Sequence, residues 1–197
     1  MTCWAVIPVK ASLESKSRLA GALDANTRRV LVRAMLTRVV DAASQASNIS
    51  QVCLLGPSRH GLPEDLPLLD EPGGGLNAAV QSALAQVSGQ RVDRIVIVAA
   101  DLPTVTASDL ELLAAAPAGE ITIAPDRHET GTNAISLPLP AAAGFSFAFG
   151  PDSFALHRAE AERLGLPVET IHSHGLARDI DEPTDLPDAA ALLKQAG

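Results

Sequence analysis

Short apolar runs alternate with amphipathic stretches along most of the chain. Runs rich in Val, Ile and Leu are typical of strands that are buried on both faces. We therefore expect strands over residues 3–9, 51–56, 94–100 and 120–124, with a short one at 66–69.

Between these runs, apolar residues recur at helical spacing. The spacing predicts helices over 25–46, 76–87 and 106–116. Asp24 can cap the first helix, and Thr106 with Asp109 forms a capping box for the third. Beyond residue 124 the pattern is irregular, although we expect further helices near Ser153 and after Pro183.

Strands that alternate with helices imply an α/β fold, with a mostly parallel twisted sheet and helices on both faces. The 197 residues suffice for one compact domain. We expect residues 1–197 to form that single domain, with a small β insertion near 133–150. In such sheets ligands bind at the carboxyl ends of the strands, so the residues that follow each strand are the first candidates for a site.

All four phenylalanines lie within residues 145–154, and the chain has one tryptophan and no tyrosine. Proteins that bind single-stranded nucleic acid need stacking rings spread along a basic groove, so this class is disfavoured. Phe145, Phe147 and Phe149 alternate, which predicts a strand with three rings on one face. The plainer alternative is a small satellite core.

The chain is acidic, with a net charge of −8. A nucleic-acid partner is therefore not expected. Residues 10–38 are an exception, because seven basic residues there accompany only Glu14 and Asp24. This segment is where a small anion would be attracted.

Targeting signals are not evident in the sequence. No apolar run reaches the ~18–20 residues of a membrane span, and the amino terminus lacks the pattern of a signal peptide. Cys3 and Cys53 lie in apolar segments without CxxC spacing. This usage is typical of reduced thiols in a cytoplasmic protein with no membrane partner.

Carboxylates stand at two places where a metal site could form. Asp101 directly follows the strand expected at 94–100, and Mg²⁺ prefers such oxygen ligands beside phosphates. Asp179 and Asp181 share a face if their segment is extended, while Ile180 points into the core. The alternatives are a turn at Asp101 and helix capping before Pro183.

Three cations follow the first strand within nine residues, namely Lys10, Lys16 and Arg18. They could hold a triphosphate, or they could form an ordinary solvated loop. The P-loop and dinucleotide-binding motifs are absent from the sequence, so those two classes lose support.

Glycine turns mark two further candidate sites, at 73–77 and at 149–153. The second leads into the helix expected near Ser153, whose free N–H groups suit a phosphate or carboxylate. Ordinary turns and an N-cap are the alternatives. His128 and His157 have no partner that the sequence makes visible.

Taken in order, these motifs resemble one family, the guanylyltransferases that activate 2-phospho-L-lactate or phosphoenolpyruvate for coenzyme F-420 biosynthesis. The matching motifs are IPVK at 7–10, SKSRL at 15–19, GGLNAAV at 74–80, ADLP at 100–103, GTNAI at 131–135, FGPDS at 149–153 and DIDEPTDL at 179–186. The resemblance implies a MobA-like, Rossmann-like nucleotidyltransferase fold.

The resemblance also implies roles for individual residues. The GTP phosphates would contact Lys10, Lys16 and Arg18, and the nucleoside would contact Gly75 and Asn77. Mg²⁺ would be held by Asp101 and Asp181, with Asp179 as the alternative second ligand. The phosphorylated acid would be bound by Thr132, Gly150 and Ser153.

The implied reaction is attack by an acceptor phosphate oxygen on the α-phosphorus of GTP, with pyrophosphate leaving. The acceptor is 2-phospho-L-lactate, phosphoenolpyruvate or 3-phospho-D-glycerate. A phosphate monoester has its second pKa near 6, so it needs no general base. The alternatives are a related transferase with another nucleotide or acceptor, and a non-catalytic GTP-binding domain. The sequence leaves the oligomeric state open, and a homodimer is one option.

Overall fold

One seven-stranded sheet organises the protein, as seen in a computed structural model that describes residues 1–9 and 16–195. The strand order is β3-β2-β1-β4-β6-β5-β7. The strands are β1 (Cys3–Pro8), β2 (Gln51–Leu55), β3 (Leu68–Leu69), β4 (Arg94–Val98), β5 (Ile121–Pro125), β6 (Thr132–Pro138) and β7 (Val168–Thr170). Only β6 runs antiparallel to its neighbours, β4 and β5, among the described strands. The predicted α/β fold with a mostly parallel sheet is confirmed.

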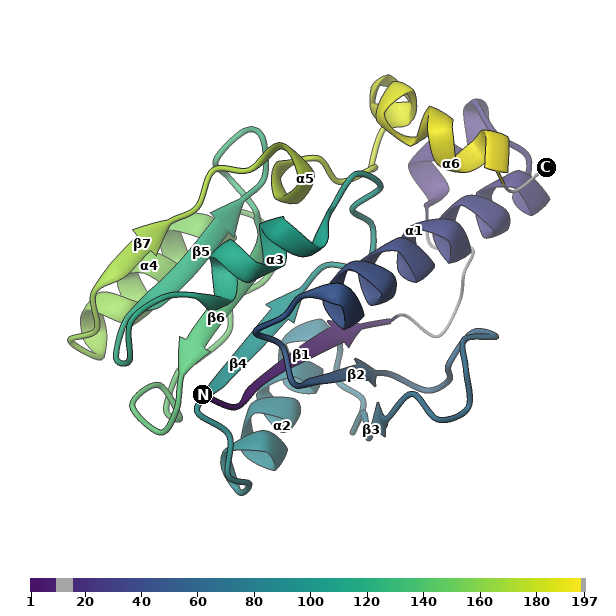
Figure 1. Cartoon of the computed structure of the whole chain (residues 1–197). Coiled ribbons are helices and arrows are strands. Elements are labelled where there is room, and N and C mark those ends of the chain that lie inside the picture. The colour runs from purple at the N-terminus through teal and green to yellow at the C-terminus, as the bar shows by residue number, and fades with distance from the viewer. Residues whose placement is uncertain (10–15, 196–197) are drawn as a thin grey trace.

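Helices cover both faces of the sheet (Figure 1), as the alternating pattern predicts. One face carries α1 (Ala25–Gln45), α3 (Ala107–Ala114) and α5 (His174–Ala177). The other carries α2 (Leu76–Ser88) and α4 (Ser153–Arg163). The capping predictions are confirmed: Asp24 accepts from the Thr27 N–H, and Thr106 and Asp109 form a capping box.

The central strands are apolar on both faces because both faces are buried. In β4, Val96 and Val98 pack in the cluster beneath α1 and α3, whereas Ile95 and Ile97 pack in the cluster beneath α2. This is why the sequence reads as a continuous apolar run there rather than as an alternating one.

A third apolar cluster ties the carboxy-terminal segment to the start of the chain. It joins η1 (Ser17–Gly21) and α1 to η2 (Pro183–Ala189) and α6 (Ala190–Gln195). Ile180 is fully buried in this cluster beside Leu19 and Leu31. The predicted inward orientation of Ile180 is confirmed, and it anchors the segment that carries Asp179 and Asp181.

The predicted β insertion near 133–150 is wrong. Residues 132–138 form β6, a buried strand inside the main sheet, and residues 145–149 form no strand. The sequence pattern missed β6 because Thr132, Asn133 and Ser136 interrupt its apolar positions. These polar residues are nevertheless buried, and Ser136, for example, accepts from the Arg94 guanidinium at 2.8 Å.

The two cysteines are free and buried, as expected for reduced thiols. Burial raises the pKa of each thiol to about 11. In the described part of the chain, no helix is both long and apolar enough to cross a membrane.

Candidate active site

The order of strands reverses between β1 and β4. From β1 the chain goes to β2 and β3 on one side, and then crosses to β4 on the other side. Ligands bind at such a switch point, outside the carboxyl ends of the strands. Asp101 follows β4 at this edge, and Lys10, the predicted phosphate ligand after β1, lies outside the described residues.

Lys16 joins two of the predicted metal ligands. Its Nζ lies 2.5 Å from an Asp101 oxygen and 2.7 Å from an Asp181 oxygen. Burial alone would lower the pKa of Lys16, but the two carboxylates outweigh it and raise that pKa. Lys16 is therefore a charged ammonium at neutral pH. Arg18, the other described cation of the loop, lies exposed in η1.

Asp179 lies near the same centre but in a drier place. Its Oδ1 accepts from the Asn133 amide at 3.2 Å. Burial, and then the negative charge of Asp101, raise the pKa of Asp179. Asp179 and Asp181, which were predicted to share a face, therefore both interact with Asp101. Asp181 does so through the shared Lys16 ammonium, and Asp179 does so through electrostatic repulsion.

Asp185 holds the segment that presents Asp181. Its Oδ2 accepts from the backbone N–H groups of Asp181 at 2.9 Å and Glu182 at 2.8 Å, and its Oδ1 accepts from the Arg127 guanidinium. Burial would raise the pKa of Asp185, but these donors outweigh it and lower that pKa. The capping alternative is thus confirmed for Asp185, whereas Asp179 and Asp181 point to the candidate site.

The carboxylates suit a hard cation, although they do not form a complete metal cage. Within residues 1–9 and 16–195, no three acidic, histidine or cysteine side chains converge closely enough to hold a metal ion. Asp101 and Asp181 do aim one oxygen each at a single cation, the Lys16 ammonium. Oxygen donors of this kind are the ligands that Mg²⁺ prefers, so the donor set fits that ion.

The glycine turn before α2 adopts a backbone that side chains disfavour. Gly73, Gly74 and Gly75 have φ values of +81°, +88° and +86°. Space beside Gly75 is open, since an added Cβ would meet nothing within 4 Å. Asn77 is already engaged: its Nδ2 donates to the Phe149 carbonyl at 3.0 Å, and its Oδ1 accepts from the Phe149 N–H at 2.7 Å. Its contact with a nucleoside stays a prediction.

The three residues predicted to bind the acid come together. The Thr132 N–H donates to Ser153 Oγ at 2.9 Å, which joins the start of β6 to the start of α4. Gly150 precedes α4 with φ +134°, and an added Cβ there would meet nothing within 4 Å. Two hydroxyls therefore lie close to a stretch of open backbone.

The backbone at 145–149 forms hydrogen bonds with side chains of two helices and not with a neighbouring strand. From α4, Glu160 accepts from the Ser146 N–H at 2.8 Å and His157 accepts from the Ala148 N–H at 3.0 Å. From α2, Gln81 and Asn77 bind backbone groups on the opposite edge. Side chains thus replace the neighbouring strands that the alternation of phenylalanines predicts.

The sequence makes no partner of His157 visible, but the structure provides one. His157 is fully buried, and its Nδ1 lies 3.0 Å from Thr132 Oγ1. Its ring packs in a T-shaped arrangement against Phe149, with centroids 4.8 Å apart. Burial lowers the pKa of His157 to about 4. One signal could have found it: Ser153 and His157 are four residues apart, so they share a face of the predicted helix.

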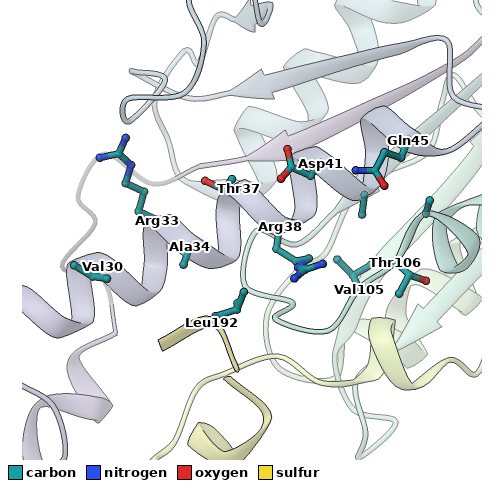
Figure 2. A pocket seen from close by; sticks show the side chains of 12 residues that line it. Val30, Arg33, Ala34, Thr37, Arg38, Asp41, Gln45, Val105, Thr106 and Leu192 are labelled. Carbon is teal, nitrogen blue, oxygen red and sulfur yellow. The ribbon is translucent and has the colours of Figure 1, made fainter. Parts of the chain in front are cut away.

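The groove in Figure 2 lies elsewhere on the surface. It has a volume of about 650 Å³ and runs between α1, residues 105–107 and Leu192. Arg33, Arg38 and Asp41 line it, and none of the predicted site residues that the structure describes does.

Comparison with known proteins identifies the family. Residues 3–191 match the model of the "Guanylyl transferase CofC like" family. A phosphoenolpyruvate guanylyltransferase of Sphaerobacter thermophilus is 40% identical over 96% of this chain and 93% of its own. A 2-phospho-L-lactate guanylyltransferase of Halorubrum lacusprofundi is 35% identical over 87% of this chain and 76% of its own.

Solved structures share the fold at low sequence identity. A putative nucleotide-diphospho-sugar transferase from Desulfovibrio desulfuricans is 15% identical with a TM-score of 0.73, covering 100% of this chain and 99% of that one. A nucleotidyl transferase from Methanothermobacter is 14% identical with a TM-score of 0.66, covering 98% and 99%. The family match and the sequence identity to its members show that the chain belongs to the CofC-like family of guanylyl transferases.

Proposed function

We propose that this protein transfers GMP from GTP to the phosphate of a small phosphorylated three-carbon acid and releases pyrophosphate. The observation that carries the proposal is the pairing of Lys16 with Asp101 and Asp181 at the switch point of the sheet. Family membership adds the identity of the nucleotide. A place in coenzyme F-420 biosynthesis, in the cytoplasm, is part of this proposal.

The reaction forms a bond between an acceptor phosphate oxygen and the α-phosphorus, and breaks the bond from that phosphorus to pyrophosphate. The acceptor is already largely dianionic at pH 7, so no base has to remove a proton. The difficulty is that two anions must meet, and charge neutralisation overcomes it. In this proposal Lys10, Lys16 and Arg18 supply positive charge to the GTP phosphates, and Gly75 and Asn77 contact the nucleoside.

Mg²⁺ is the proposed cofactor. Asp101 and Asp181 would hold it, and Asp179 is the alternative to Asp181. Bound there, the ion would neutralise phosphate charge and polarise the phosphoryl oxygens. Asp181 is the first ligand to test, because it shares the Lys16 ammonium with Asp101, whereas Asp179 accepts from the Asn133 amide.

Thr132, Gly150 and Ser153 would bind the acid. The relative with the higher identity quoted above is named for phosphoenolpyruvate, which makes this acid the first to test. 2-Phospho-L-lactate differs from phosphoenolpyruvate only by two hydrogens, a change worth about 1–3 kcal/mol in a pocket. In 3-phospho-D-glycerate the phosphate is on the terminal carbon and a hydroxyl lies beside the carboxylate. The natural acceptor must therefore be found by direct competition.

The test supplies GTP and Mg²⁺ with the three acids, first singly and then together at equal concentration, and follows pyrophosphate release and the guanylylated products. We expect release with at least one acid, none without an acid, and much less when CTP replaces GTP. Absence of release with all three acids would refute the proposed function.

A further inference from the structure

We propose that His157 is a positioning residue for the acceptor, because it fixes the Thr132 hydroxyl as a hydrogen-bond donor toward the acid. This inference rests on the proposed function, in which Thr132 binds the phosphorylated acid. It assigns a role to a buried side chain that does not itself reach the substrate.

The argument begins with the proton on the imidazole. A backbone N–H can only donate, so the contact from Ala148 N at 3.0 Å requires His157 Nε2 to be an unprotonated acceptor. In a neutral imidazole the proton then resides on Nδ1. That nitrogen lies 3.0 Å from Thr132 Oγ1 and must donate to it.

The consequence falls on the Thr132 hydroxyl. Its oxygen accepts from His157, so its own hydrogen cannot point toward the imidazole. Among the described residues no acceptor for that hydrogen is found. Ser153 Oγ is in a similar position, since it accepts from the Thr132 N–H at 2.9 Å. Both hydroxyls thus accept from the protein and keep a hydrogen for a ligand.

A ligand for two such hydroxyls should be rich in acceptors. The oxygens of a carboxylate or of a phosphate dianion accept hydrogen bonds and donate none, whereas an alcohol or amine would also present donors. Because His157 is buried and neutral near pH 7, it orients Thr132 without adding a charge. Thr132 and Ser153 would thus select an anion, because both hydroxyls donate to the ligand.

Two substitutions separate the two contacts of His157. In His157→Gln the amide oxygen can reach the Nε2 position and accept from Ala148, but no donor remains for Thr132. In His157→Asn the amide nitrogen occupies the Nδ1 position and can still donate to Thr132. We expect His157→Gln to raise the KM for the acid about 10- to 100-fold. The KM for GTP should change less than about twofold, and His157→Asn should raise the acid KM by much less.

A double-mutant cycle tests whether His157 acts through Thr132. Thr132→Val removes the hydroxyl at constant shape and should raise the acid KM to a similar extent, whereas Thr132→Ser should retain most of the affinity. His157→Gln should then add less than about twofold in the Thr132→Val background. Multiplying effects would overturn the proposal, because His157 would then act by another route.

A third measurement needs neither a variant nor turnover. A long-range ¹H–¹⁵N NMR spectrum of the wild-type protein reports which imidazole nitrogen carries the proton. We expect the Nδ1–H tautomer for His157 at pH 7, and an Nε2–H tautomer or a charged ring would refute the assignment. If the wild type releases no pyrophosphate with any acid, the proposed function fails. Normal turnover with an unchanged acid KM in His157→Gln refutes this inference alone.

Discussion

The candidate site has two halves of opposite character. One is the charged centre of Lys16, Asp101 and Asp181, in which the Asp181 side chain is 52% exposed. The other is the acid wall of Thr132, Ser153 and His157, which are 7%, 2% and 0% exposed. The first half is built from loops, and the second is built on a strand and a helix.

The contrast fits the proposed role of each half. In the proposed reaction, negative charge shifts from the attacking oxygen to the leaving pyrophosphate at the charged centre, so charged groups have most to stabilise there. The acid wall would only hold a ligand, and an unpaired buried charge would be costly. Neutral hydroxyls that a neutral histidine orients can recognise an anion without that cost.

Loss of the Asp101 charge should have the largest effect. Asp101→Asn keeps the size of the side chain but removes the negative charge that pairs with Lys16 and would hold Mg²⁺. We expect kcat to fall by at least about 10³-fold. Pyrophosphate release measures the loss, and circular dichroism checks that the fold persists. Unchanged turnover would remove Asp101 from the metal role.

Replacing Lys16 tests the other sign of charge at the same centre. Lys16→Met leaves Asp101 and Asp181 without their shared cation, and we expect kcat to fall about 10²-fold with a higher KM for GTP. Lys194→Met is the matched control, because Lys194 is exposed on α6. Equal activity of the two variants would contradict the role of Lys16.

A substitution in the acid wall should have a weaker effect, and the effect should appear in the KM for the acid instead of in kcat. Ser153→Ala removes the hydroxyl that accepts from the Thr132 N–H, a hydrogen bond worth about 0.5–1.5 kcal/mol. We expect the KM for the acid to rise about 3- to 10-fold with kcat little changed. Glu162→Ala, at an exposed position of the same helix, is the control. A fall in kcat alone would erase the proposed division between the two halves.

The smallest effect concerns the pH dependence of stability. The Arg163 guanidinium and the Ser146 N–H lower the pKa of Glu160 to about 2, despite its burial. Because the folded-state pKa lies below the unfolded value of 4.5, the stabilisation by Glu160 is complete above pH 4.5 and is lost as pH falls toward 2. Glu160→Gln should therefore weaken the pH dependence of the urea midpoint of unfolding between about pH 5 and pH 3, where carboxyls titrate. Glu162→Gln, at an exposed position, should keep the pH dependence of the wild-type protein. If the urea midpoints of Glu160→Gln and Glu162→Gln changed equally with pH, the role assigned to Glu160 would be contradicted.

The charged centre could be predicted further than the acid wall. Asp101 and the Asp179–Asp181 segment follow from strand ends and alternation, because local spacing determines which way these residues point. Lys16 was expected at the phosphates, and its pairing with two distant carboxylates is a tertiary contact that spacing does not show. Most strands of the parallel sheet could likewise be predicted from the sequence, because buried strands are continuous apolar runs.

The acid wall depends on contacts that no local pattern contains. His157 contacts Thr132 and Ala148 only once β6 and α4 pack together, so the residues next to it in the sequence do not predict these contacts. The prediction of a strand from Phe145, Phe147 and Phe149 is wrong, because alternation indicates which way side chains point but not which groups bind the backbone. Side chains of α2 and α4 bind the backbone of this segment.

The reversed strand β6 restricts how the acceptor specificity of this enzyme can change. Its first two residues, Thr132 and Asn133, point in opposite directions, toward His157 and toward Asp179. One peptide bond therefore sets the spacing between the proposed acid site and the carboxylates. Substitutions in β6 that adapt the site to a new acid would therefore also disturb the proposed metal ligands. Changes in residues 148–153 avoid this conflict, so new specificity should arise there first.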